Sequence, residues 1–206
     1  MRDWIKYYVQ NTINRSPSPL RGFAFAALAL TLLTVAKLTA LRLVPGSADL
    51  ALHVPPWLLL PAVALLGTLI VWGALVFGET LLLGDPARTA EMVGLGFAPL
   101  ALTGAVELVL AAWWPVRLQA PPRPEDMLER LLWAAEVQAA AQRSPIYYAL
   151  TAVELLGVLA GVYVFYQAAR IWKPAKAGTA AAVFGTFMLG IWVLRNYPSL
   201  AAILGA

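Results

Sequence analysis

The sequence contains no cysteine and only one histidine among its 206 residues. The absence of cysteine excludes disulfides, catalysis by a thiolate, and metal or iron–sulfur sites with cysteine ligands. A single histidine excludes a haem held by two histidines of the same chain. That residue, His53, has only Asp49 nearby as a second candidate ligand. We therefore expect no bound metal and no cofactor, because a metal site needs several ligands in one place.

Charged residues are also scarce. They make up 13% of the chain, whereas 61% of the residues are apolar, and the mean hydropathy is +0.72. Soluble domains average about half apolar and a quarter charged residues, so these values exclude an ordinary water-soluble fold of this length. The lysines and arginines behind the net charge of +4 stand at the ends of apolar runs and form no contiguous stripe. The sequence therefore predicts no nucleic-acid partner.

Five long apolar runs remain, each flanked by glycine, proline or charged residues. They cover residues 23–44, 57–77, 92–114, 146–169 and 179–194. Backbone polar groups cannot stay unpaired in hydrocarbon, so we expect helices, and the short alternating strands of a membrane barrel are not seen. The sequence predicts an all-α fold, a polytopic transmembrane helical bundle that forms one domain over residues 1–206. Its first residues lack the apolar core of a cleavable signal, and we expect the initial methionine to be retained.

A further helix is predicted between the third and fourth spans. Residues 125–142 place Met127, Leu128, Leu131 and Leu132 on one face of a helix, which is typical of an amphipathic interfacial helix. Residues 3–13 show a weaker pattern of the same kind. Such helices can cap the bundle of their own chain, or they can bind a partner or a curved membrane.

The distribution of lysine and arginine predicts the orientation in the membrane. The N-terminal segment and the fourth connection are rich in these residues, and the first connection, residues 45–56, has none. Short cytoplasmic loops carry an excess of lysine and arginine. We therefore expect a bacterial inner-membrane protein with a cytoplasmic N-terminus and an external C-terminus. The third connection carries four arginines on the predicted outer side, which is the main contrary evidence.

Three charged residues fall inside the predicted spans: Lys37, Glu107 and Glu154. Charges within a bilayer are costly and usually paired or functional. The predicted topology places all three at a similar depth in the outer half of the membrane, so we expect Lys37 to pair with at least one of the glutamates. The group could be a polar pocket for an ion, a proton or a lipid headgroup. It could equally be a clasp that fixes the order of the helices, and Lys37 could instead extend its side chain to the interface.

Small residues predict a close contact between helices. Gly157 and Gly161 form a Gly-x-x-x-Gly motif in the fourth span, a spacing that lets two helices approach closely, within one chain or between two chains. The sequence contains no nucleophile elbow, no His-Glu-x-x-His helix and no phosphate-binding glycine loop. We therefore predict that the protein is not an enzyme.

One stretch resembles a known family. In FGETLLLGDPARTAEMVGLGFAPLAL, residues 77–102, a glycine-containing polar connection leads into a span with Gly96-Phe97-Ala98-Pro99-Leu100. Together with the proline-marked entry INRSPSPLRGFAF, residues 13–25, this resembles the Yip family of Rab-GTPase-interacting proteins and their bacterial relatives. The resemblance singles out Gly96 and Pro99. It implies a five-span membrane scaffold or adaptor, associated in eukaryotic members with vesicle traffic, and it supplies no activity for bacterial relatives.

Two functions follow from these observations. The first is a non-catalytic scaffold or accessory subunit, with the lipid bilayer and other membrane protein subunits as its partners. The second is a small transporter or channel subunit that uses Lys37, Glu107 and Glu154. Five spans do not divide into the two equal repeats that many transporters show, which favours the first hypothesis.

Overall fold

Five long helices make up most of the computed structural model. The structure describes residues 7, 9–12, 16–43, 56–114, 116–118, 129, 136, 140 and 143–204. The helices are α2 (Pro19–Ala40), α3 (Pro56–Leu83), α4 (Pro86–Trp113), α6 (Pro145–Trp172) and α7 (Ala177–Leu204). All but α7 begin with a proline, whose fixed φ angle and missing N–H suit the first position of a helix.

Each of these helices contains a stretch that is long and apolar enough to cross a membrane, which makes five candidate spans. The chain is therefore a multi-pass membrane protein with an all-α bundle, and the predicted fold class is confirmed. The predicted interfacial helix at residues 125–142 lies almost entirely outside the described residues. At the N-terminus, Val9 is completely buried in the hydrophobic core, so this part of the predicted amphipathic segment packs against the bundle of its own chain.

The predicted span boundaries differ from the observed ones at the end of α2, in the connection between α3 and α4, and at the end of α7. Residues 41–44 were expected to continue the first helix, but α2 ends at Ala40 and strand β1 (Leu41–Leu43) follows. This strand pairs in parallel with β2 (Val116–Leu118), with Leu41 opposite Val116. A short apolar run has no periodicity that distinguishes a helix from a strand, which explains the difference.

The second difference concerns the connection between α3 and α4, which is much shorter than predicted. Gly84, with a φ of 88°, ends α3, because glycine adopts positive φ without a steric penalty. The Asp85 carboxylate then caps α4 by accepting from the N–H groups of Ala87 and Arg88 at 3.0 and 3.2 Å. These local interactions place Glu79 and Glu91 inside helices rather than in a loop.

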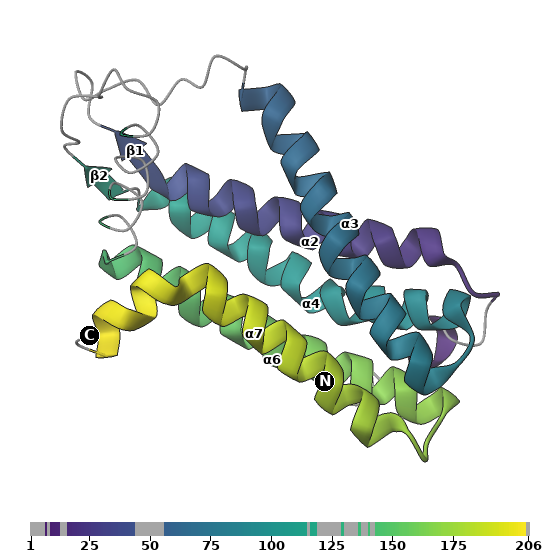
Figure 1. Cartoon of the computed structure of the whole chain (residues 1–206). Helices are drawn as coiled ribbons and strands as arrows, with labels where there is room; N and C mark the ends of the chain where they lie inside the picture. The colour runs from purple at the N-terminus through teal and green to yellow at the C-terminus, as the bar shows by residue number, and fades with distance from the viewer. Residues whose placement is uncertain are drawn as a thin grey trace.

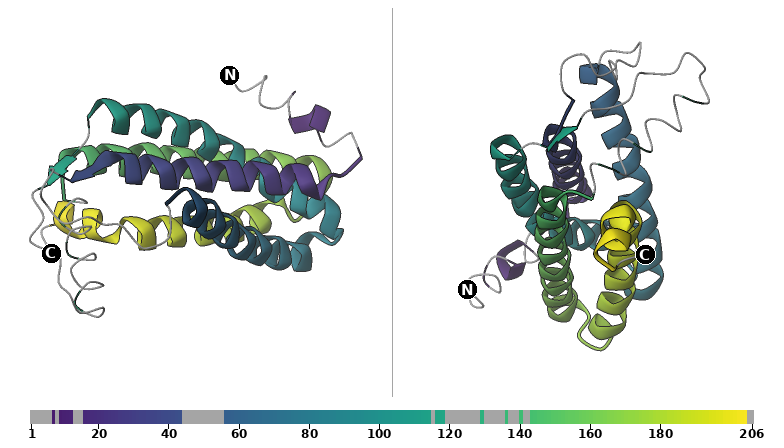
Figure 2. Two further views of the ribbon diagram at one scale, coloured as in Figure 1. Left: turned by 90° about the horizontal axis from the view of Figure 1, so that it is seen from above. Right: turned by 90° about the vertical axis from the view of Figure 1, so that its left-hand side faces the viewer.

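The helices alternate in direction, as Figure 1 shows. The turns between α3 and α4 and between α6 and α7 lie at one end of the bundle, and the strands and the C-terminus lie at the other. The most extensive contact joins α2 to α4, which run in the same direction, and α4 packs in turn on α6, and α6 on α7. Helix α3 crosses obliquely and makes fewer contacts, and over residues 65–83 it is the least buried of the five candidate spans (Figures 1 and 2).

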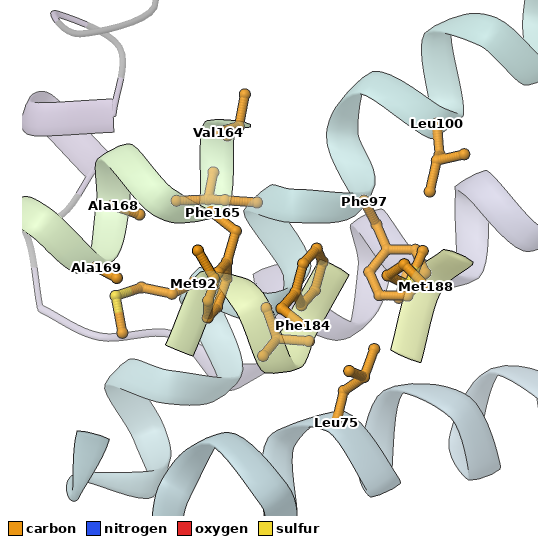
Figure 3. Packing of buried hydrophobic residues seen from close by; sticks show 14 of the residues in the cluster. Leu75, Met92, Phe97, Leu100, Val164, Phe165, Ala168, Ala169, Phe184 and Met188 are labelled. Carbon is orange, nitrogen blue, oxygen red and sulfur yellow. The ribbon is translucent and has the colours of Figure 1, made fainter. Parts of the chain in front are cut away.

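The core lies where α4, α6 and α7 meet (Figure 3). Phe165 stacks on Phe184 with ring centroids 4.4 Å apart, and Phe97 meets Phe184 edge to face at 6.4 Å. Leu75 of α3 reaches the same cluster. Aromatic pairs of this geometry add to the burial of their rings and hold the three helices in register.

Candidate functional site

Lys37 lies in the last turn of α2 and points into the bundle. Its ammonium group donates to the Glu154 carboxylate of α6 and to the Asn196 side-chain oxygen of α7, both at 2.8 Å. The side chain of Lys37 is only 14% exposed and that of Glu154 only 3%. A charged pair this deeply buried needs good geometry and further hydrogen bonds to offset the loss of hydration.

Asn196 supplies those further bonds. Its side-chain amide donates to Glu154 at 3.2 Å and to the Trp192 carbonyl at 2.8 Å, and its oxygen accepts from the Thr151 hydroxyl at 3.0 Å. One residue earlier on the same helix, Arg195 approaches the other oxygen of Glu154 at 3.6 Å. Glu154 is therefore surrounded by donors from two helices, and we call Lys37, Thr151, Glu154, Arg195 and Asn196 the polar cluster.

Tyr147 fixes the end of α2 beside this cluster. Its hydroxyl donates to the backbone carbonyl of Lys37 at 2.7 Å. The last carbonyls of a helix lack partners within the helix, so this bond satisfies one of them in a region that is poor in water. It also sets the position of Lys37 relative to α6.

Glu107 of α4 is the predicted member that the cluster does not bind. Its side chain is completely buried, and neither carboxylate oxygen has a hydrogen-bond partner within the described part of the chain. It interacts electrostatically with Glu154, Lys37 and Arg195. Of the three residues singled out from the sequence, the structure thus joins Lys37 and Glu154 directly and leaves Glu107 beside them.

Helices α4 and α6 approach closely at the predicted glycines. A Cβ atom added to Gly161 would collide with the Gly96 carbonyl oxygen, and one added to Gly157 would collide with the Thr103 hydroxyl. The Gly-x-x-x-Gly motif therefore serves packing within the chain. Gly96 also faces the ring of Phe184 at a point where any side chain would clash.

Pro99 lies within α4, three residues after Gly96. It has no N–H to donate to the carbonyl of the residue four positions earlier, which is Leu95. The segment from Gly96 to Leu100 is thus a part of α4 with close helix contacts and one missing backbone hydrogen bond.

Comparisons with models of protein families, with curated proteins and with solved structures found no match to this chain.

Sequence reasoning missed three members of the cluster: Thr151, which lies inside the predicted fourth span but was not singled out, and the neighbouring residues Arg195 and Asn196 of α7. The predicted fifth span ended at residue 194 because these polar residues interrupt the apolar run, whereas α7 continues to Leu204. The apolar tail at residues 200–204 was the signal that the helix extends past them.

One small cavity lies beside the cluster. The cavity lined by Glu154 and Arg195 has a volume of only about 10 Å³, about the minimum needed for one water molecule. The described residues contain no group of three or more potential metal-ligating side chains. Because His53 and Asp49 lie outside them, the absence of a metal stays a prediction.

Proposed function

We propose that the protein is a non-catalytic scaffold or accessory subunit of a membrane protein complex. One observation carries the proposal: the charges inside the bundle bind one another, so that Lys37 of α2, Glu154 of α6 and Asn196 of α7 form a clasp. Such a clasp fixes the helix order, which is a structural task. Polar residues that specify one arrangement of helices are the best-attested use of buried ion pairs.

The space beside the clasp supports the same proposal. The cavity that Glu154 and Arg195 line has room for about one water molecule, and an ion that entered it would compete with Lys37 for the Glu154 carboxylate. In transporters, polar residues in the membrane instead line a water-filled path.

Glu107 favours the alternative of a small transporter or channel subunit. A buried carboxylate without a hydrogen-bond partner among the described residues is typical of a group that exchanges partners during function. In this alternative, Lys37 moves between Glu154 and Glu107 as a proton or an ion passes.

The orientation that we propose places the N-terminus in the cytoplasm of a bacterial cell. The basic residues of the first and fourth connections support this orientation, since Arg21, Lys173 and Lys176 lie at the end of the bundle where α2 begins. Arg42, Arg117 and Arg143 lie toward the other end and count against it. A relationship with bacterial Yip-like proteins stays part of this proposal, supported by Gly96 and Pro99 in their helical context.

Co-purification and liposome flux together test the proposal. We expect wild-type protein, extracted in a mild detergent after cross-linking in membranes, to carry partner subunits in fixed stoichiometry. The double variant with Lys37→Met and Glu154→Gln removes both charges of the pair, and we expect it to retain these partners if it is folded. Protein that purifies alone and passes an ion in liposomes, with the flux lost in Glu107→Gln, would contradict the scaffold and favour the alternative.

A further inference from the structure

A second polar region lies at the opposite end of the bundle, near the starts of α2 and α4. A cavity of about 170 Å³ opens there between the N-terminal segment and these two helices. Its lining consists of Asn11, Thr12, Arg21, Gly22, Phe25, Glu91 and Leu95. Cavities of about 150 Å³ hold a benzene molecule, so this one has room for a small chemical group.

The floor and the rim of this cavity carry opposite charges. The side chain of Glu91 is only 2% exposed, whereas that of Arg21 is 40% exposed. The Nη2 atom of Arg21 lies 3.0 Å from Oε1 of Glu91. Arg88 approaches the other oxygen of Glu91 at 3.5 Å. Neither contact has the geometry of a hydrogen bond, and both carboxylate oxygens lack a hydrogen-bond partner within the described part of the chain. The carboxylate therefore has unused acceptor capacity, and because its oxygens have almost no exposed surface, a donor in the cavity reaches them when the Arg21 side chain at the rim moves aside.

Arg21 can bind an anion at the rim. Its two hydrogen-bond-distance contacts, to the Ser16 carbonyl at 3.1 Å and to Glu91, both use the Nη2 atom. A guanidinium group has five N–H donors in a planar fork that matches the oxygens of a phosphate. The side chains of Asn11 and Thr12 add polar groups on the same side, and Phe25 and Leu95 form an apolar wall.

The position of the cavity matches the surface of the bilayer. Arg21 is two residues from the start of α2, and Glu91 is five residues into α4, about 7 to 8 Å along the helix at 1.5 Å per residue. A group that reaches from the headgroup layer toward the start of the acyl chains passes this depth.

We propose that this cavity binds the headgroup of a phospholipid with a primary amine, its phosphate on Arg21 and its ammonium on Glu91. The acidic floor complements the ammonium of this zwitterion, and the basic rim complements its phosphate. Hydrogen bonds that involve a charged group are stronger than those between neutral groups. The inference requires that this end of the bundle lies at the membrane surface and does not depend on the scaffold function.

Native mass spectrometry of the full-length protein in mild detergent tests the proposal. The protein is offered an equimolar mixture of phosphatidylethanolamine, phosphatidylcholine and phosphatidylglycerol with the same acyl chains. Phosphatidylcholine has the same phosphate, but its methylated amine cannot donate a hydrogen bond. We expect phosphatidylethanolamine to be retained about tenfold over both others, since a hydrogen bond to a charged group changes a dissociation constant by about this factor.

Variants separate the two halves of the site. Glu91→Gln should abolish the preference for phosphatidylethanolamine over phosphatidylcholine, whereas Glu79→Gln, which changes a buried glutamate of α3 that does not line the cavity, should leave it intact. Arg21→Gln should weaken the retention of both lipids about tenfold, whereas Arg170→Gln, an exposed arginine at the same end of the bundle, should not. If loss of a charge impairs folding, Asn11→Phe fills the rim from an exposed position and should displace the lipid.

Three results would overturn the assignment. Equal retention of the three lipids would show that the cavity does not select an amine. Equal effects of Arg21→Gln and Arg170→Gln would show that only general surface charge matters. Displacement of the lipid by an equal concentration of soluble phosphoethanolamine would identify a free metabolite rather than a membrane lipid as the ligand.

Discussion

Lys37 obtains its hydrogen-bonding partners from the far end of the sequence. Glu154 is 117 residues away and Asn196 is 159 residues away, yet both lie within 2.8 Å of the ammonium group. Removing one partner from a buried ion pair leaves an uncompensated charge, and this costs more than removing both partners. The stability of the bundle therefore depends on the whole cluster rather than on any one of its residues.

A double-mutant cycle measures this dependence. Lys37→Met should lower the free energy of unfolding by about 3–5 kcal/mol, the range for breaking a buried pair. Lys37→Met combined with Glu154→Gln should cost less than the sum of the single variants, because no charge of the pair is then left unpartnered. Reversible unfolding in mixed detergent micelles gives the three free energies.

The same cycle with Glu107→Gln is the control, and its coupling energy should be smaller because Glu107 has no hydrogen bond to Lys37. Additivity within about 0.5 kcal/mol for both glutamates would contradict the pairing. It would indicate instead that Lys37 extends to the interface.

For single residues, the sequence indicated which charged side chains lie inside the membrane and at what depth, but not which of them bind one another. The positions of Lys37, Glu107 and Glu154 along their spans predicted that they lie at one level of the membrane. Which of two glutamates receives the lysine depends on the rotation of α4 and α6 about their axes, and this rotation is set by packing. Asn196 was missed for the same reason, because a polar residue next to Arg195 looks like the end of a span until its partners in other helices are known.

Helix α6 lies close to α4 because glycines remove the side chains between them. Gly161→Ala should destabilise the protein by about 1–3 kcal/mol, since its methyl group would meet the Gly96 backbone, which cannot move aside as a side chain can. Gly190→Ala in α7 is the matched control. Outside its own helical turn, no atom of the described residues lies within 4 Å of its added Cβ, so the higher helix propensity of alanine should leave the stability unchanged or raise it by up to about 1 kcal/mol. Thermal unfolding in detergent compares the two, and equal losses would contradict the close contact.

Asn196 connects helix α7 to α2 and α6 through hydrogen bonds, in addition to the apolar contacts of α7. Asn196→Leu keeps the branching and the number of heavy atoms of the side chain but removes hydrogen bonds to Lys37, Thr151 and Glu154. We expect a loss of about 1–3 kcal/mol, the cost of leaving a buried polar group unsatisfied. Tyr197→Leu changes the next residue, which is 66% exposed, and should have little effect. A smaller loss for Asn196→Leu than for Tyr197→Leu would show that the cluster does not hold α7.

The lengths of the elements were less predictable than their number. Hydropathy detects the apolar middle of each span, whereas the ends depend on caps and tertiary contacts. Lys176, for example, donates to the carbonyl of Leu82 at 2.6 Å, which satisfies the end of α3 from the turn before α7. No pattern within residues 56–83 indicates this bond.

The absence of cysteine makes the topology directly measurable, because any introduced cysteine is the only one in the chain. Ser16, Ala175 and Arg143 are exposed, and the alternation of helices places the first two at one end of the bundle and the third at the other. With a cytoplasmic N-terminus, an impermeant thiol reagent should label Arg143→Cys in intact cells. It should label Ser16→Cys and Ala175→Cys only after permeabilisation. Labelling of Ala175→Cys in intact cells would reverse the orientation, and different sides for residues 16 and 175 would contradict the order of the spans.

For the whole molecule, composition and the apolar runs alone indicated that the protein lies in a lipid bilayer and crosses it five times. The neighbours of each helix did not follow from it, because apolar faces that contact lipid and apolar faces that contact protein have the same residue types. Only glycines and intramembrane charges distinguished the faces that contact protein from those that contact lipid. They explain why the contacts of α2, α4, α6 and α7 have recognisable signals in the sequence, whereas the oblique position of α3 has none.

The clasp also determines when the protein can be completed during synthesis. Helix α2 is inserted early, but the acceptors of Lys37 arrive only with α6 and α7. Until then a nascent chain holds an uncompensated lysine in the membrane, beside whichever insertase or chaperone shelters it. Quality-control proteases that recognise exposed intramembrane charges can thus distinguish a chain that lacks α6 and α7 from one that has inserted them, and this degradation signal disappears when Glu154 and Asn196 reach Lys37.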